Sequence, residues 1–297
     1  MPTTDSIPFN IDHIRSQIDQ AMATFLDTLN LPTKLDEPIR YALLAPGKRI
    51  RPLLCWASAQ AAGGDGTESL PPAVAVELIH AFSLVHDDLP ALDNDDLRRG
   101  RPTLHKHAGE AAAILAGDAM LALAFEALSS INPHPTTDTH AKLITQLCEG
   151  TRAMIVGQVY DTLAGFDDAL TDQHKIELIH KNKTGALIHA SCLMGATAAI
   201  ADQSTLDLIS GFAIDLGLQF QIIDDLLDVQ GDPTKVGKAL RKDQDANKLT
   251  YPAILGIEQS NHIIGTLHQN ALTKLDQIGP SSAGLRLLLD LMTNRSH

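Results

Sequence analysis

Helical periodicity is the feature that most constrains the fold of this chain, because strand-like alternation of apolar and polar residues is nearly absent. The stretch "SLPPAVAVELIHAFSLVHDD" shows a helix start, with Ser69 as the expected N-cap and prolines in the first turn. Aromatic residues, which favour strands, make up only 4% of the chain. We therefore predict an all-α fold of about ten or more helices. A single domain over residues 1–297 is the simplest arrangement.

Clusters of Gly, Pro, Ser and Asp mark the expected loops between helices. They lie at Gly63–Pro72, Asn132–Asp138, Ala164–Asp172, Gly231–Gly237 and Gly279–Gly284. The uncharged run Gly185–Ala201 is too short and too rich in small residues for a membrane span. This run is therefore expected to form a buried, tightly packed helix.

Net charge and cysteine usage limit the possible partners and compartment. The net charge of −13 argues against broad nucleic-acid binding, which needs a basic surface. Cys55, Cys148 and Cys192 are far apart and without CxxC spacing, so we expect buried small residues in a reducing compartment. The N-terminal stretch lacks the basic and apolar regions of a secretory signal. We expect a cytoplasmic protein that binds neither nucleic acid nor membranes.

The stretch "VHDDLPALDNDDLRRGRP" concentrates negative charge and then reverses it. It contains Asp87, Asp88, Asp93, Asp95 and Asp96, followed by Arg98, Arg99 and Arg101. Two carboxylates about 4 Å apart repel by roughly 4 kcal/mol at an effective dielectric of 20. On a straight helix Asp87 and Asp93 would lie about 120° apart. Since Pro90 breaks the helix, a disturbed turn is expected to bring them together, and His80 and Ser83 share the Asp87 face.

A second acidic cluster lies in "FQIIDDLLDVQGD", where Asp224 and Asp228 are four residues apart on one helix face. Mg²⁺ commonly uses one or two carboxylates together with substrate phosphates and water. Two facing helices with such clusters would hold several Mg²⁺ ions around a diphosphate. Taken alone, Asp224 and Asp228 are equally consistent with a solvated helix end. The sequence has no EF-hand, HExxH, P-loop, GxGxxG or GxSxG pattern.

Basic residues accompany both acidic clusters. Each one alone is more typical of a surface charge than of a ligand, but their combination with the aspartates favours a phosphate site. The group comprises Lys48, Arg49 and Arg51 in "PGKRIRP", Arg98 and Arg99 after the first cluster, Lys183 in "KNKTGA", and Lys238 and Lys248 beyond the second.

These motifs resemble the trans-isoprenyl diphosphate synthases, of the bacterial farnesyl diphosphate synthase type. The resemblance rests on "GKRIRP", "LIHAFSLVHDDLPALDNDDLRRGRPTLHK", "LAGD", "GQVYD", "KTGAL", "FQIIDDLLD" and "NKLTYPA", in family order. It implies an isoprenoid synthase fold with helices around a central cavity, usually as a homodimer. The sequence departs from the family at Arg241 and Asn247, where glycines are frequent.

The resemblance also implies residue roles. About three Mg²⁺ ions, with Mn²⁺ as an alternative, would be bound by Asp87 and Asp93 with Asp88 assisting, and by Asp224 with Asp228. The allylic diphosphate would be held by Arg98, Lys183 and Lys238, and that of isopentenyl diphosphate by Lys48, Arg51, His80 and Arg99. Thr184 and Gln221 would face the developing cation, and Lys248 would close over the site. A core histidine is the alternative role for His80.

The implied reaction is ionisation of dimethylallyl or geranyl diphosphate, condensation with isopentenyl diphosphate and loss of a proton. Phe82 and Ser83, just before the first motif, would set the product at C15, although Phe82 is equally suited to core packing. Geranyl and geranylgeranyl diphosphate synthases are the alternatives within the family.

Three readings from other classes compete. A terpene cyclase would carry a different metal motif in place of "DDLLD". The His86–Asp87 pair suggests an HD-type phosphohydrolase, which would need more metal-binding histidines and would leave "DDLLD" unexplained. A non-catalytic prenyl synthase subunit tends to lose motif aspartates, and both motifs are complete here.

Overall fold

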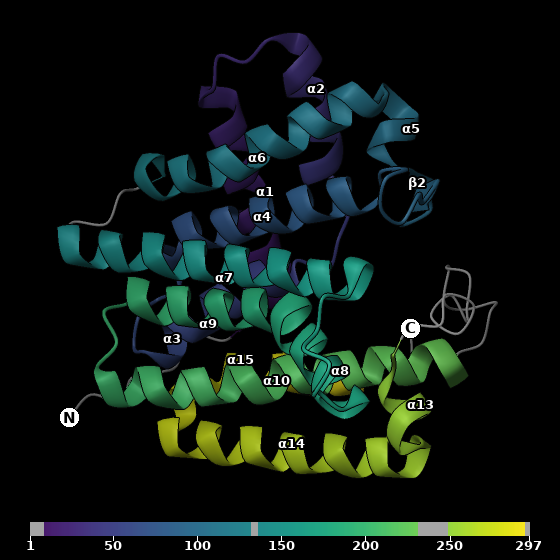
Figure 1. Ribbon diagram of the computed structural model, residues 1–297. Coiled ribbons are helices and arrows are strands. Elements are labelled where there is room, and N and C mark those ends of the chain that lie inside the picture. Colours follow the sequence, from purple (N-terminus) through teal and green to yellow (C-terminus); the bar gives the residue numbers. More distant parts are fainter. Residues whose placement is uncertain (1–8, 132–135, 231–248, 295–297) are drawn as a thin grey trace, which may run out of the picture.

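The computed structural model describes residues 9–131, 136–230 and 249–294 (Figure 1). Its helices are α1 (Ile11–Thr28), α2 (Thr33–Leu43), α3 (Ile50–Ala61), η1 (Thr67–Ser69), α4 (Leu70–Asp87), α5 (Leu104–Ala108), α6 (Glu110–Ser130), α7 (Thr137–Leu163), α8 (Asp172–His180), η2 (Lys181–Gly185), α9 (Ala186–Ala198), α10 (Gln203–Gln230), α13 (Tyr251–Leu255), α14 (Ile257–Ile278), η3 (Pro280–Ser282) and α15 (Ala283–Thr293). Among the described residues the strands are β1 (Leu97–Arg98) and β2 (Arg101–Pro102), which pair antiparallel. The predicted all-α fold is confirmed.

The long helices are stacked in layers (Figure 1). Helix α4 packs against α6, and α9 packs against α3, α7 and α10. Helix α14 covers the other side of α10. Because α4, α7 and α10 run toward the same side of the molecule, their C-terminal ends lie at one end of the stack, next to the β1–β2 hairpin and α13 (Figure 1).

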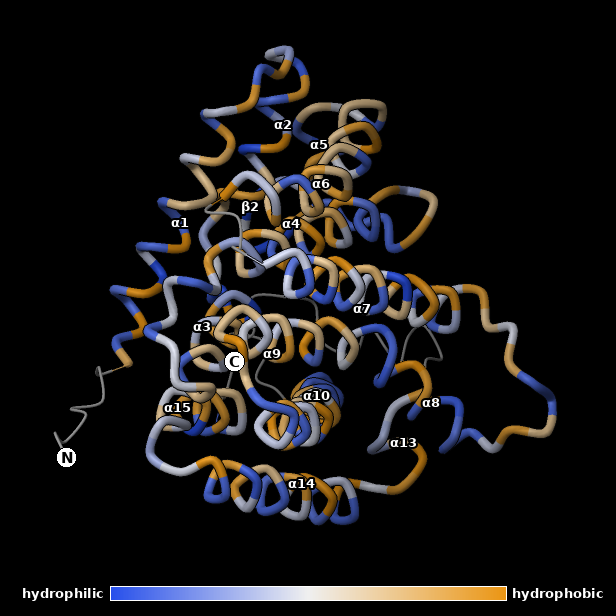
Figure 2. The backbone as a smooth tube through the Cα atoms, turned by 90° about the vertical axis from the view of Figure 1, so that its left-hand side faces the viewer, coloured by the Kyte–Doolittle hydropathy of each residue, from blue (hydrophilic) through white to orange (hydrophobic). Residues whose placement is uncertain are grey.

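Apolar residues on one face of each outer helix turn toward a common core. In Figure 2, hydrophobic and hydrophilic stretches alternate along α1 and α14, as expected for helices that pack through one face. The inner helix α9 is buried along nearly its whole length. This confirms the prediction of a tightly packed helix in the run Gly185–Ala201.

The buried apolar residues that the structure describes form two clusters. The larger one joins α1, α2, α3, α4, α6, α9 and α15 with parts of α5, α7, α10 and α14. The smaller one contains Ile176, Ile222, Leu226 and Tyr251, and ties together α8, α10 and α13. The C-terminal part of α10 therefore has its own apolar support, separate from the main core.

Two local predictions are wrong. Ser69 makes no side-chain cap, because its hydroxyl donates to the Gly66 carbonyl at 2.6 Å within the 3₁₀ turn η1. Cys55 and Cys192 are buried as predicted, but Cys148 is exposed on α7.

The loop predicted at Ala164–Asp172 is confirmed, since α7 ends at Leu163 and α8 begins at Asp172. The loop predicted at Gly231–Gly237 lies outside the described residues.

In the part of the chain that the structure describes, three stretches are long and apolar enough to cross a membrane by length and composition alone: Thr67–Asp87, Glu110–Ser130 and Gln203–Val229. The shares of their most apolar windows that are buried inside the structure are 72%, 44% and 44%. Much of their apolar surface is therefore used in helix packing.

Close packing of α3 against α9 gives a testable prediction. A Cβ atom added to Gly195 would lie 2.0 Å from the Cys55 carbonyl oxygen, so one of the two backbones must move. We expect Gly195→Ala to lower the free energy of unfolding in urea by about 1–3 kcal/mol. Gly265 on α14 is the matched control, because nothing lies within 4 Å of an added Cβ. Gly265→Ala should raise stability by up to about 1 kcal/mol; equal effects of the two substitutions would contradict the packing argument.

Candidate active site

The first acidic cluster lies where α4 ends. Helix α4 ends at Asp87, and the turn after it returns the chain so that the amide of Asp93 donates to the Asp87 carbonyl at 2.8 Å. Asn94 in this turn has a left-handed backbone, with φ of 48°. The break around Pro90 therefore brings Asp87 and Asp93 together, as predicted.

Two of the predicted residues, Asp88 and Arg98, form an ion pair. The Arg98 guanidinium forms a forked contact with the buried Asp88 carboxylate, with Nε 2.9 and 2.8 Å from its two oxygens and Nη2 2.5 Å from one. Asp95 lies 3.8 Å from the same arginine. Arg98 therefore neutralises one buried carboxylate of the cluster, while Asp87 keeps its place on the cavity wall.

The group in "PGKRIRP" divides into a structural residue and a cavity residue. Buried Arg49 donates to Asp19 and Glu77, both at 2.8 Å, and to the Ala45 carbonyl at 2.9 Å. Arg51 instead lines the central cavity, and its Nε has no hydrogen-bond partner. Arg49 thus fixes the start of α3, whose first turn carries Arg51 to the cavity.

Arg51 and His80 lie together on the cavity wall. Burial lowers the pKa of His80 well below its usual value, and the nearby Arg51, Arg99 and Arg98 charges lower it further. Burial also lowers the pKa of Arg51, against the opposing effects of Glu77 and Asp224. The imidazole is therefore neutral at pH 7 and can donate one hydrogen bond to an anion.

Lys183 and Thr184 are carried by the π-helical turn η2, a feature frequent at functional sites. The turn packs directly on α7, since a Cβ on Gly157 would lie 2.0 Å from the Lys183 amide nitrogen. The Lys183 ammonium lies 2.5 Å from Asp161 Oδ2. Asp161 ends the motif "GQVYD" but is not among the predicted site residues. It lies on the same face of α7 as Gly157, four residues earlier, and this spacing alone does not identify Lys183 as its partner.

The central cavity has a volume of about 520 Å³ and opens between α4, α6, α7 and η2. Its polar wall contains predicted residues from three elements. These are Arg51, His80, Ser83, Asp87, Lys183 and Thr184. Its apolar wall includes the predicted chain-length residue Phe82 with Leu121, Met154, Ile155 and Val159. One side of the cavity thus suits an anion and the other a hydrocarbon.

A smaller cavity of about 110 Å³ connects this site to α10. It shares Lys183 and Thr184 with the central cavity, and Gln221 and Asp225 line its α10 side. Asp224 precedes Asp225 on that helix, and its charge acts on the Arg51 guanidinium. Asp224 on α10 therefore acts on a cation that lines the same cavity as Asp87.

The carboxylates have properties that fit a divalent cation. Burial raises the pKa of Asp87 to about 6; Asp93 and Asp88 raise it and Lys183 and Arg98 lower it. Asp228 Oδ2 is buried without a hydrogen-bond partner. Within the described residues no three Asp, Glu, His or Cys side chains converge on one point. A bound ion would therefore take its remaining ligands from phosphate oxygens and water, as Mg²⁺ commonly does.

The remaining predicted residues fall into two groups. Arg99 donates to the Pro46 carbonyl at 3.2 Å, which brings it beside the loop that carries the exposed Lys48. Lys238 and Lys248, together with Arg241 and Asn247, lie outside the described residues.

His86 is used in helix packing. Its Nε2 lies 3.1 Å from the Ile114 carbonyl oxygen on α6, and its ring packs edge-on against Phe82. Gly117 leaves the room for this ring, because an added Cβ would lie 2.1 Å from Nε2. This position disfavours the HD-type hydrolase, in which His86 would share a metal with Asp87.

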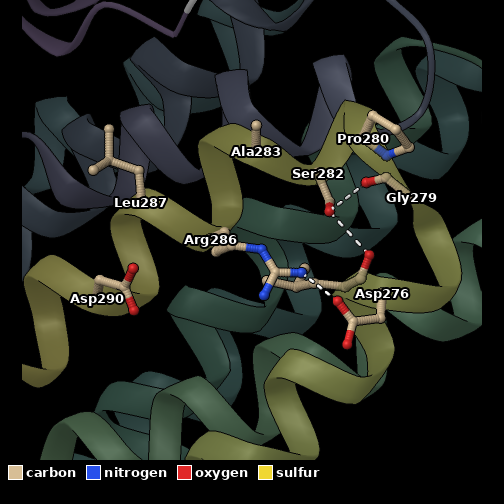
Figure 3. Close-up of a pocket in the computed structure, with 9 residues that line it drawn as sticks. Asp276, Gly279, Pro280, Ser282, Ala283, Arg286, Leu287 and Asp290 are labelled. Atoms are coloured by element: carbon tan, nitrogen blue, oxygen red, sulfur yellow. Dashed lines mark hydrogen bonds and ion pairs between the residues drawn. The ribbon is translucent and has the colours of Figure 1, made fainter.

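A separate hollow of about 520 Å³ lies where α14 meets η3 and α15 (Figure 3). Arg286, the basic residue in its wall, is paired with Asp276 at 2.6 Å, and Asp290 also lines it. Its charge is therefore less suited to a diphosphate than that of the central cavity.

The raised pKa of Asp87 gives a prediction for the metal-free protein. Between about pH 4 and pH 6 the folded state binds more protons than the unfolded state, so this residue lowers stability as the pH rises. We expect Asp87→Asn to raise the free energy of unfolding by roughly 1–3 kcal/mol at pH 8 and to have little effect below pH 4. Urea unfolding at both pH values measures this.

The control is Asp96→Asn, which removes an exposed carboxylate paired with Lys106 at 2.9 Å. Its effect should stay within about 1 kcal/mol at both pH values. A loss of stability in Asp87→Asn at pH 8 would contradict the assignment of Asp87 as a strained buried charge.

Comparison with known proteins agrees with this geometry. Residues 32–278 match the polyprenyl synthetase family. A farnesyl diphosphate synthase of Geobacillus stearothermophilus is 39% identical over 286 residues, 95% of this chain and 96% of the relative. A chloroplastic geranylgeranyl pyrophosphate synthase of Catharanthus roseus is 42% identical over 255 residues, 85% of this chain and 71% of the relative.

A solved FPP/GFPP synthase from Zymomonas mobilis has a similar fold, with a TM-score of 0.83, 34% identity and coverage of 95% of this chain and 97% of that one. The fold is therefore the predicted isoprenoid synthase fold. The chain belongs to the polyprenyl synthetase family, among the short-chain trans-prenyltransferases.

Proposed function

We propose that this prenyltransferase condenses isopentenyl diphosphate with dimethylallyl or geranyl diphosphate to give farnesyl diphosphate, with Mg²⁺ as cofactor. The observation that carries the proposal is the two-sided cavity, where Asp87, Lys183 and Arg51 face an apolar wall that contains Phe82. The farnesyl diphosphate synthase that matches 95% of this chain supports the C15 product.

The diphosphates would be divided between two cationic groups. Lys183 and Arg98 lie near Asp87 and would hold the allylic diphosphate. The Lys183 ammonium is oriented by its ion pair with Asp161. Arg51, neutral His80 and Arg99 would hold the diphosphate of isopentenyl diphosphate, together with Lys48. Mg²⁺ bound at the aspartates would neutralise the departing diphosphate.

The other side chains would protect the allylic cation. Thr184 and Gln221, which line the two cavities, would face the developing charge without providing a strong nucleophile. Phe82, Leu121 and Met154 would exclude water from the hydrocarbon chain. The double bond of isopentenyl diphosphate attacks the cation, and the proton then lost passes to the released diphosphate.

We propose that the active form is a homodimer. Exposed apolar residues gather on α6 and α7, at Ile114, Leu115, Ile155, Val156, Val159 and Leu163. Ile155, Val159 and Leu163 also line the central cavity. A second copy that covers this face would shield the cavity from solvent, and sedimentation of the purified protein tests the stoichiometry.

The direct test incubates purified protein with Mg²⁺, isopentenyl diphosphate and either allylic primer, followed by chromatography of the dephosphorylated products. A C15 alcohol is expected, and EDTA should abolish its formation. A C10 or C20 main product would favour the geranyl or geranylgeranyl alternative. Phosphate release without a new carbon–carbon bond would favour a hydrolase, and no turnover would favour a non-catalytic subunit.

The apolar wall predicts which residues limit product length. Phe82 is buried and Ser83 is half-buried, and both line the cavity, so their side chains set the room left for a growing chain. Phe82→Ala should lengthen the main product beyond C15, and Ser83→Phe should shorten it toward C10. Leu97→Ala, on the exposed hairpin, is the control that should leave the product unchanged. Unchanged products in both cavity variants would remove this assignment.

A further inference from the structure

Asp225 lies between the two residues of the second acidic cluster, and its carboxylate contacts α13. Its carboxylate is buried, with 4% of the residue exposed, and Oδ2 accepts a hydrogen bond from the Tyr251 amide at 2.9 Å. Tyr251 is the first residue of α13. Asp225 therefore caps the start of α13 from the neighbouring helix α10.

His180 completes this contact. It is the last residue of α8, is 4% exposed, and its Nε2 lies 3.6 Å from Asp225 Oδ2. Its ring stacks on the Tyr251 ring with 5.4 Å between centroids and 23° between planes. Burial lowers the pKa of His180 to about 3, so the imidazole is neutral at pH 7.

Asp225, His180 and Tyr251 connect α10 with the end of α8, which leads into η2. Different sequence motifs lie on α10 and on η2. His180 directly precedes η2, which carries Lys183 and Thr184, and Asp225 directly follows Asp224 on α10. The small core cluster of Ile176, Ile222, Leu226 and Tyr251 packs α8, α10 and α13 at the same place. The orientation of Asp224 relative to Lys183 therefore depends on this contact.

We propose that Asp225, His180 and Tyr251 form a positioning lock that holds the end of α10 against η2, and that Asp225 acts in this lock and not as a metal ligand. The inference rests on the proposed function, because the lock places residues expected to bind the allylic diphosphate. Without the lock the binding-competent arrangement is only partly populated, which raises the apparent dissociation constant but leaves the saturated site intact.

The test compares Asp225→Asn with Asp225→Ala. Asparagine keeps an oxygen at the position that accepts from the Tyr251 amide and lies beside His180, whereas alanine leaves the Tyr251 amide unpaired. For Asp225→Ala we expect KM for the allylic diphosphate to rise about tenfold. Its kcat and the Mg²⁺ concentration for half-maximal activity should stay within about threefold of wild type. Asp225→Asn should stay within about threefold in all three quantities.

Asp224→Asn is the matched comparison, because it removes the neighbouring carboxylate that the proposed function assigns to metal binding. Only this variant should raise the half-saturating Mg²⁺ concentration strongly. If Asp225→Asn and Asp225→Ala both raise it as Asp224→Asn does, Asp225 is a metal ligand and the lock is overturned. A lower Tm in Asp225→Ala with unchanged KM also overturns it, since the role is then only structural.

A measurement without turnover separates this inference from the proposed function. Amide hydrogen exchange in peptides that cover α13 should be about tenfold faster in Asp225→Ala than in wild type, and near wild type in Asp225→Asn. Equal exchange in all three proteins overturns the lock. Failure of the wild-type protein to form any prenyl product would instead overturn the proposed function.

Discussion

Burial of the Asp87 carboxylate beside other acidic residues is the constraint on which the site depends. Asp87 lies on the cavity wall with Asp93 returned beside it by the turn after α4, and burial raises its pKa to about 6. Such an arrangement destabilises the metal-free protein and is retained only where another charge compensates it. Arg98 compensates Asp88, and a divalent cation with a diphosphate would compensate the rest.

Close helix packing positions Lys183 and Arg51, the cations that line the same cavity as Asp87. Gly157 lets the π-helical turn η2 approach α7, and Asp161 on the same helix holds the Lys183 ammonium. Arg49 fixes the loop before α3 through Asp19 and Glu77, which leaves Arg51 to line the cavity. In the first place a missing side chain and an ion pair, and in the second place a pair of ion pairs, determine where a cavity-lining charge lies.

Much of this arrangement was predictable from the sequence. Helical periodicity gave the all-α fold, Pro90 gave the broken turn, and the motifs gave the residues around the cavity. The structural role of Arg49, the Asp161–Lys183 pair and the buried contact of Asp225 with Tyr251 depend on neighbours that are far apart in the chain. Local spacing does not specify such neighbours, and for the same reason Cys148 was wrongly expected to be buried.

The proposed function requires that the acidic ends of α4 and α10 bind one metal–diphosphate group together. A double-mutant cycle on Asp87→Asn and Asp224→Asn tests it most directly, with Mg²⁺-dependent binding of inorganic pyrophosphate measured by calorimetry. The account predicts a coupling free energy of about 1 kcal/mol or more, because loss of either carboxylate removes part of the same site. Strictly additive effects of the two substitutions would contradict it.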